Sequence, residues 1–172
     1  AVAEDWAVGR AFAAGRLGVM VPEGCDAVQA EGARAVARLA EGLGLAVEER
    51  AFPAVMAARA GVVARRVLTA SLAEWMGFLG VSGEELTPIA AAVLEEGRAM
   101  GAADLVAASR EMAVLTAEWE GWMAGVDAVL SPVLAGGVPK VGAFDMAARD
   151  VAAHFAQMGE VAPGAALANA AG

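Results

Sequence analysis

The sequence predicts an α/β fold that consists of a βαβ unit and a cover of long helices. A short apolar run, residues 17–21, and a second strand pattern, residues 45–49, enclose a helical pattern within about 30 residues, the length of a βαβ unit. Residues 54–124 then carry apolar side chains at helical spacing. A chain of 172 residues has room for one domain, so we expect two parallel strands joined by a right-handed crossover.

The βαβ unit is predicted within residues 15–53. Pro22 and Gly24 close the first strand with a turn, and Asp26 is of the residue type that caps a helix N-terminus. Gly44 offers a C-terminal stop. The helix between them is indicated by apolar residues at helical spacing: Val28, Val36, Leu39 and Leu43.

Residues 54–124 are expected to be helical throughout. A first stripe ends near Gly80 and includes Leu68, Leu72, Trp75 and Leu79. The spacing of Ser82 and Glu85 is that of a capping box, and Thr87-Pro88 suits the start of a second helix, so we expect a one-turn element and then a helix to about residue 98. After Gly101, spacings of three and four continue through Leu105, Ala108, Met112, Leu115, Trp119 and Trp122. We expect the tryptophans of these stripes to pack in the core.

Residues 125–172 are predicted to hold a strand, a loop rich in Pro and Gly, a helix and a truncated tail. The strand spans 127–130 and ends at Ser131-Pro132, because Pro cannot donate to a sheet ladder. The loop that follows, to Gly142, has few polar residues, which suggests that it packs against something or lines a pocket. A helix is expected over 145–158, and the tail from Pro163 consists of small residues without a cap or a charged end.

Composition argues against several function classes. The net charge of -9 disfavours nucleic-acid binding, which depends on Lys and Arg contacts to phosphates. No apolar run is long enough to span a membrane, and the first residues lack the pattern of a secretory signal. The single cysteine, Cys25, excludes an internal disulfide and fits a cytoplasmic protein.

Reactive side chains are few, and none forms a convincing catalytic set. His154 lies in an apolar helical context, where packing is commoner than catalysis. Ser131 lacks the frame of a nucleophile elbow, Lys140 lacks a feature that would lower its pKa, and Cys25 fits a small filler residue in a turn. The acidic pairs Glu48-Glu49 and Glu95-Glu96 point apart and lack a histidine companion, so we interpret them as solvated faces and expect no metal or other cofactor.

Several stretches, taken in order, resemble the C-terminal part of the amidase signature family of serine amide hydrolases. Residues 15–21 resemble the opening strand, and 33–49 resemble the following helix and the strand "L-x-x-x-G-H-x-V-E", with Leu45 where His is common. The stretches 85–88, 96–98 and 104–108 resemble the helical region before the strand "Y-D-x-x-L-x-P-T". That strand corresponds to residues 126–133, in which Val126 and Val133 replace the usual aromatic residue and Thr. Residues 169–172 resemble "N-x-x-G".

The resemblance implies a single partial domain, 1–172, of a larger mixed-sheet amidase signature fold. It implies hydrolysis of C–N bonds in small linear or cyclic amides, with no cofactor, by a Ser, cis-Ser and Lys set that lies in an upstream Gly- and Ser-rich region. Lys140 is in the wrong segment for that set, so this chain alone is expected to be inactive. The residues that the resemblance places at the substrate-pocket rim are Pro132, Val133, Pro139, Asn169 and Gly172.

Two other interpretations stay open. The chain is alternatively a non-catalytic interaction module, whose helix stripes and sheet edges bind a partner or a second copy as a homodimer. It is alternatively a small-molecule-binding module built on the βαβ unit.

Overall fold

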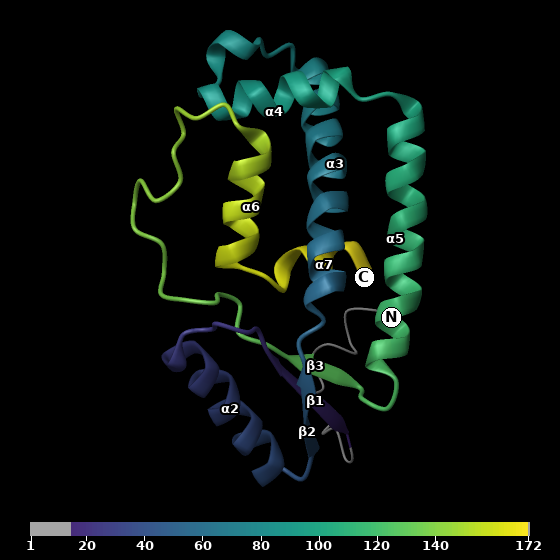
Figure 1. The fold of residues 1–172 in the computed structure, drawn as a ribbon, viewed down its shortest axis with the longest axis vertical. Coiled ribbons are helices and arrows are strands. Elements are labelled where there is room, and N and C mark those ends of the chain that lie inside the picture. Colours follow the sequence, from purple (N-terminus) through teal and green to yellow (C-terminus); the bar gives the residue numbers. More distant parts are fainter. Residues whose placement is uncertain (1–14, 172) are drawn as a thin grey trace, which may run out of the picture.

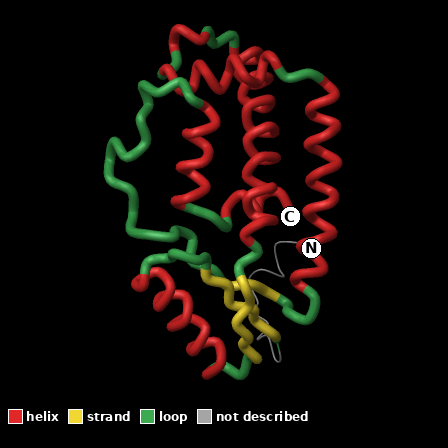
Figure 2. The backbone as a smooth tube through the Cα atoms, viewed as in Figure 1, coloured by secondary structure: helices red, strands yellow, loops and turns green. Residues whose placement is uncertain are grey.

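The computed structural model describes residues 15–171, which form a small sheet layer and a taller unit of helices (Figures 1 and 2). The prediction of an α/β fold is confirmed. The elements are β1 (Arg16–Val21), α2 (Ala27–Gly42), β2 (Ala46–Ala51), α3 (Ala54–Leu79), the 3-10 turn η1 (Gly83–Glu85), α4 (Pro88–Ala99), α5 (Ala102–Met123), β3 (Ala128–Leu130), α6 (Val151–Val161) and α7 (Ala165–Ala171). None of the helices in the described range is long and apolar enough to cross a membrane.

The sheet has the strand order β2-β1-β3, and both strand pairs are parallel. Leu17 lies opposite Val47 of β2 on one side and Ala128 of β3 on the other. The prediction of a parallel βαβ unit is therefore confirmed. Because all three described strands run the same way, their carboxyl ends, followed by Pro22, Phe52 and Ser131, share one edge of the sheet.

Helix α2 begins and ends where the sequence predicts. The Asp26 side chain accepts a hydrogen bond from the Val28 backbone N–H (2.7 Å), and Gly44, with φ +94°, follows the helix end. The apolar stripe that predicted the helix is not its buried face: Val28 is 76% and Leu43 81% exposed. The buried residues of α2 are all alanines, namely Ala30, Ala33 and Ala37.

The main core lies between α3, α5 and α7. Its buried members are Ala57, Ala60, Val63, Ala108, Leu115, Leu167, Ala170 and Ala171, with Met112 and Trp119 packed against them. The α5 stripe therefore forms core as predicted. On α3 the stripe from Leu68 to Leu79 is more exposed than the alanine face, and Trp75 is 58% exposed, so the expected core packing of Trp75 is wrong.

The turn η1 and helix α4 confirm the two helix starts that were predicted within residues 82–88. The Ser82 backbone N–H donates to the Glu85 carboxylate (2.8 Å), and α4 begins at Pro88 after Thr87. Helix α4 crosses α3 closely at Gly97, where a Cβ atom would meet the Thr69 carbonyl and would lie 2.9 Å from the Ala73 Cβ.

One prediction near the C-terminus is wrong, and one helix there was not predicted. Helix α6 begins at Val151 rather than at residue 145, because the Asp150 side chain caps it by accepting from the Ala153 N–H (2.9 Å). Asp145 instead accepts from the Ala147 N–H (2.8 Å) and makes a local turn. The tail is helical: α7 forms from a strong helix-former sequence whose apolar face is buried against α3 and α5.

Candidate functional site

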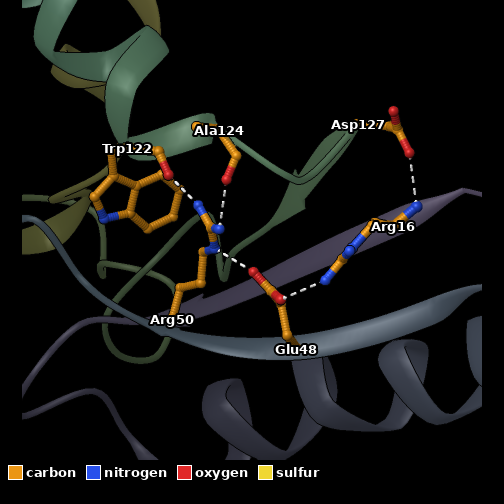
Figure 3. Close-up of polar contacts among 6 residues, drawn as sticks. All are labelled: Arg16, Glu48, Arg50, Trp122, Ala124 and Asp127. Carbon is orange, nitrogen blue, oxygen red and sulfur yellow. Dashed lines mark hydrogen bonds and ion pairs between the residues drawn. The ribbon is translucent and has the colours of Figure 1, made fainter.

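Charged side chains gather where the sheet meets the end of α5 (Figure 3). Glu48 and Arg50 are two positions apart in β2 and so share one face of the sheet. Arg50 Nε donates to Glu48 Oε1 (2.5 Å), and Arg16 Nη2 donates to Glu48 Oε2 (3.3 Å). Gly18 in β1 leaves room for this arrangement, because a Cβ there would lie 3.4 Å from Arg50 Cδ.

Arg50 also binds the C-terminal end of α5. Its guanidinium donates to the Trp122 carbonyl and to the Ala124 carbonyl (2.8 Å), and it lies 5.3 Å from the Trp122 ring centroid. A cation is favourable at a helix C-terminus, where carbonyl groups lack intrahelical partners. We call Arg50, Glu48 and Arg16, together with the α5 end they bind, the Arg50 cluster; it joins the sheet layer to the helical unit.

The Arg50 cluster lowers the pKa of the Glu48 carboxyl group from its ordinary value. The hydrogen bond from Arg50 is the main cause, with smaller contributions from the charge of Arg50 and from Arg16, against a desolvation that raises the pKa. A carboxylate held ionised by two guanidinium groups is a poor proton donor at neutral pH. The geometry therefore suits a structural ion pair.

The interpretation of the acidic pairs as solvated faces is confirmed for Glu49 and Glu95, whose side chains are 71% and 65% exposed, whereas the side chains of Glu48 and Glu96 are half-buried. Each of the four carboxylates binds an arginine: Glu48 as described, Glu49 to Arg34, Glu95 to Arg149 and Glu96 to Arg65. Within residues 15–171 no cluster of three or more His, Cys, Asp or Glu side chains could hold a metal ion.

A cavity of about 850 Å³ lies between α3, α4 and α6. Its two long walls are mostly alanine and glycine at helical spacing, from Ala54 to Gly61 on α3 and from Ala152 to Gly159 on α6, with Val62 and Phe155 as the larger apolar residues. Rows of alanine and glycine keep the two helices from filling the space between them. The volume falls within the range of small-molecule sites.

Polar groups of the cavity gather toward α4. Arg65 donates two hydrogen bonds to Glu96, from Nε (2.8 Å) and from Nη2 (2.7 Å), and this pairing raises the pKa of Arg65. Arg66 and Asp104 also line the cavity. Asp104 accepts from the Gly101 N–H (3.0 Å) at the start of α5.

The rim residues that the sequence suggested lie elsewhere. Pro132 is buried after β3, Val133 is 78% exposed, Pro139 is half-buried and Asn169 is exposed on α7; none of these four lines the cavity. Gly172 lies outside the described residues.

The loop that carries Pro132, Val133 and Pro139 is held in place by backbone hydrogen bonds at Ala135. The Ala135 carbonyl accepts from the Asp26 N–H (2.6 Å), and the Ala135 N–H donates to the Val161 carbonyl (2.9 Å). The loop valines Val138 and Val141, by contrast, point to solvent.

The reactive side chains are dispersed over the described part of the chain. The Ser131 hydroxyl donates to the adjacent Pro132 carbonyl (3.2 Å), and His154 packs edge-on against Phe144 at 5.8 Å, in agreement with its interpretation as a packed residue. Lys140 is exposed in the loop, and Cys25 lies half-buried in the turn before α2. The cavity lining contains none of these four residues.

Neither the cavity nor the Arg50 cluster was predicted from the sequence. The signal for the cavity is the row of small residues in the first half of α3, on the helix face that the Leu68 stripe continues, and for the cluster it is the alternation of Glu48 and Arg50 in a strand beside Gly18. No protein-family model, no curated protein and no solved structure matches this chain.

Proposed function

We propose that this chain is the C-terminal portion of an amidase that hydrolyses C–N bonds of small linear or cyclic amides. The observation that supports the proposal is the sheet. The three segments 15–21, 45–49 and 126–133, which resemble strands of the amidase signature family, lie side by side as β1, β2 and β3. In the complete enzyme the remaining strands would extend these three into a larger mixed sheet.

In this proposal the chain supplies scaffold, and the Ser, cis-Ser and Lys set lies outside it. Ser131 and Lys140 take no part, since Ser131 donates to its neighbouring carbonyl and Lys140 is an exposed loop residue. The loop with Pro132, Val133 and Pro139 contributes to the pocket rim of the complete enzyme, where another segment would cover its exposed valines. The enzyme is cytoplasmic and binds a small amide, and it needs no cofactor.

Amide hydrolysis assays of two polypeptides test the proposal. The 172-residue chain and the same chain extended upstream through its reading frame are assayed on a panel of simple amides. We expect turnover by the extended polypeptide only. Turnover by the short chain, or inactivity of a folded extended one, contradicts the proposal.

Two variants of the extended polypeptide test whether Ser131 and Lys140 take part in the reaction. Ser131→Ala and Lys140→Ala should keep kcat within about twofold, because neither side chain belongs to a group that acts as a catalytic unit. Loss of activity in either variant, with an unchanged melting temperature, would place the chemistry inside this chain.

A second candidate function, self-association, is favoured by the outward face of α2. Val28, Leu39 and Leu43 are each more than two-thirds exposed, although they form one helical stripe. Exposed apolar patches of this kind mark contact surfaces. Light scattering coupled to size exclusion should show a dimer that Leu39→Glu dissociates; a monomer at all concentrations contradicts this function.

A further inference from the structure

The cavity between α3, α4 and α6 is a groove that is open to solvent. Helices α3 and α6 lie side by side and run in opposite directions, with α4 across one end (Figure 1). The lining on α3 runs from Ala54 to Arg66, a span of about 18 Å at 1.5 Å per residue. Ala58 of α3 and Ala152 and Ala156 of α6 line the groove and are exposed. Room for a further element therefore remains between the two helices.

Helix α6 has little cover on the side of the groove. Of its 11 residues only Val151 is buried. An isolated helix shorter than about 12 residues is marginal in water, and helices in proteins are stabilised mainly by the packing of an apolar face. The face of α6 that lines the groove carries Phe155 and small residues and no charge before Glu160. We therefore expect an apolar surface to pack against this face.

The outward face of α2 is an apolar surface of similar length. Its exposed stripe consists of four branched residues, each at least half exposed: Val28, Val36, Leu39 and Leu43. The stripe is about 22 Å long, and its protruding side chains fit the hollows that alanine and glycine leave in a helix surface. The exposed apolar residues at the end of α3 cover only about one turn and are too short to fill the groove: Trp75, Phe78 and Leu79.

The charges of the two surfaces do not oppose their contact. Helix α2 has two glutamates and two arginines, and none of them lies in the stripe. Arg38 binds Glu31, and Arg34 binds Glu49. The groove is lined by two arginines and three acidic residues, which lie toward its ends: Arg65, Arg66, Glu96, Asp104 and Glu160. The middle of the groove and the stripe are both uncharged, so apolar packing governs the contact.

We propose that the stripe of α2 docks in the groove of a second copy, and that two copies do so reciprocally in a twofold dimer. One contact is too small: the four side chains remove about 250 Å² from water, and with the groove side about 500 Å², the size of a crystal contact. Two contacts bury about 1,000 Å², which a specific interface requires. The reciprocal pair also closes the assembly. This proposal rests on self-association, the second candidate function, and not on amide hydrolysis.

Light scattering coupled to size exclusion, on the full chain and its variants, tests the two surfaces. Leu39→Glu places a charge in the stripe, and Gly61→Glu places one in the groove, since a Cβ at Gly61 meets nothing within 4 Å. Each variant alone should dimerise at least about tenfold more weakly than the wild type, the effect of losing one buried leucine. Gly77→Glu, also on α3 but outside the lining, is the control and should dimerise like the wild type.

A mixture of the two variants distinguishes docking in the groove from pairing of like surfaces. Leu39→Glu keeps an intact groove and Gly61→Glu an intact stripe, so the equimolar mixture can form one complete contact. The mixture should associate at least about tenfold more tightly than either variant alone. Circular dichroism should show wild-type helix content throughout, because Leu39 is exposed and glutamate favours a helix more than glycine does.

The outcomes separate this inference from the functions proposed above. A dimer that Gly61→Glu leaves intact, or a mixture that shows no recovery, overturns docking in the groove and leaves self-association standing. Equal weakening by Gly77→Glu and Gly61→Glu also overturns it. A wild-type chain that stays monomeric at all concentrations overturns both the inference and self-association. None of these results bears on the amide hydrolysis assay.

Discussion

The helical unit and the sheet layer are stabilised in different ways. In the helical unit, large apolar residues such as Leu115 and Leu167 are almost fully buried between α3, α5 and α7. In the sheet layer, α2 packs through alanines while Leu39 and Leu43 face outward. Hydrophobic stabilisation scales with buried apolar area, so alanine contacts contribute much less. Polar contacts, above all the Arg50 cluster, therefore carry a larger share of the stability in the sheet layer.

The largest expected effect contrasts one leucine from each region. Leu115→Ala should lower the free energy of unfolding by about 3 kcal/mol, since it removes a fully buried side chain and leaves a cavity. Leu39→Ala in α2 should change it by less than about 0.5 kcal/mol, because that side chain is mostly exposed. Urea unfolding followed by circular dichroism measures both. Equal losses would contradict the contrast between the two regions.

The next effect concerns the crossing of α3 and α4. Gly97→Ala should destabilise by about 2 kcal/mol, because the new Cβ would collide with the Thr69 carbonyl and the helices must separate. Gly77→Ala is the matched control, since its Cβ meets nothing within 4 Å. In that helix position alanine should stabilise by about 0.5–1 kcal/mol. Thermal unfolding of the two variants should therefore move in opposite directions.

A smaller effect is expected at the junction of the two regions. Arg50→Ala should destabilise by about 1–2 kcal/mol, because it leaves the carbonyls of Trp122 and Ala124 without this donor and leaves Glu48 with Arg16 alone. Arg38→Ala, which breaks an exposed pair with Glu31, should cost less than about 0.5 kcal/mol. Urea unfolding gives the free energies, and hydrogen exchange should show faster opening of β2 in Arg50→Ala alone. A cost for Arg38→Ala as large as for Arg50→Ala would mean that the cluster has no special role.

The parts of the fold that could be predicted from the sequence are those fixed by local signals and not by tertiary contacts. Local signals placed the ends of α2, η1 and α4, because Asp26, Ser82 and Pro88 act within one helical turn. The helix over α7 was missed, since its stability depends on the contact of Leu167 with α3 and α5, which no local pattern encodes.

The candidate site could be predicted from the sequence even less well than the fold. The cavity between α3, α4 and α6 arises because small residues of α3 and α6, about 90 to 105 positions apart in the chain, face one another. Periodicity identifies small-residue faces on single helices, but the pairing of two such faces depends on how the helices dock. The apolar stripes of α2 and of the later part of α3 are largely exposed for the same reason. An apolar stripe predicts a helix, but it does not identify the element that packs against it.

The smallest expected effect tests the Arg50 cluster through pH. Because the Arg50 hydrogen bond lowers the pKa of Glu48 in the folded chain, this carboxylate stabilises the fold above its ordinary pKa of 4.5. That contribution is lost as the pH falls from 4.5 through the lower folded-state value, where the folded chain also takes up the proton. Glu48→Gln should therefore be less stable than the wild type at pH 7, and the difference should shrink on acidification. Melting temperatures between pH 7 and pH 3 measure it, with Glu74→Gln as the control for removing an exposed carboxylate from α3. A difference that stays constant across that range would mean that Glu48 contributes to the cluster through its shape and hydrogen bonds and not through its charge.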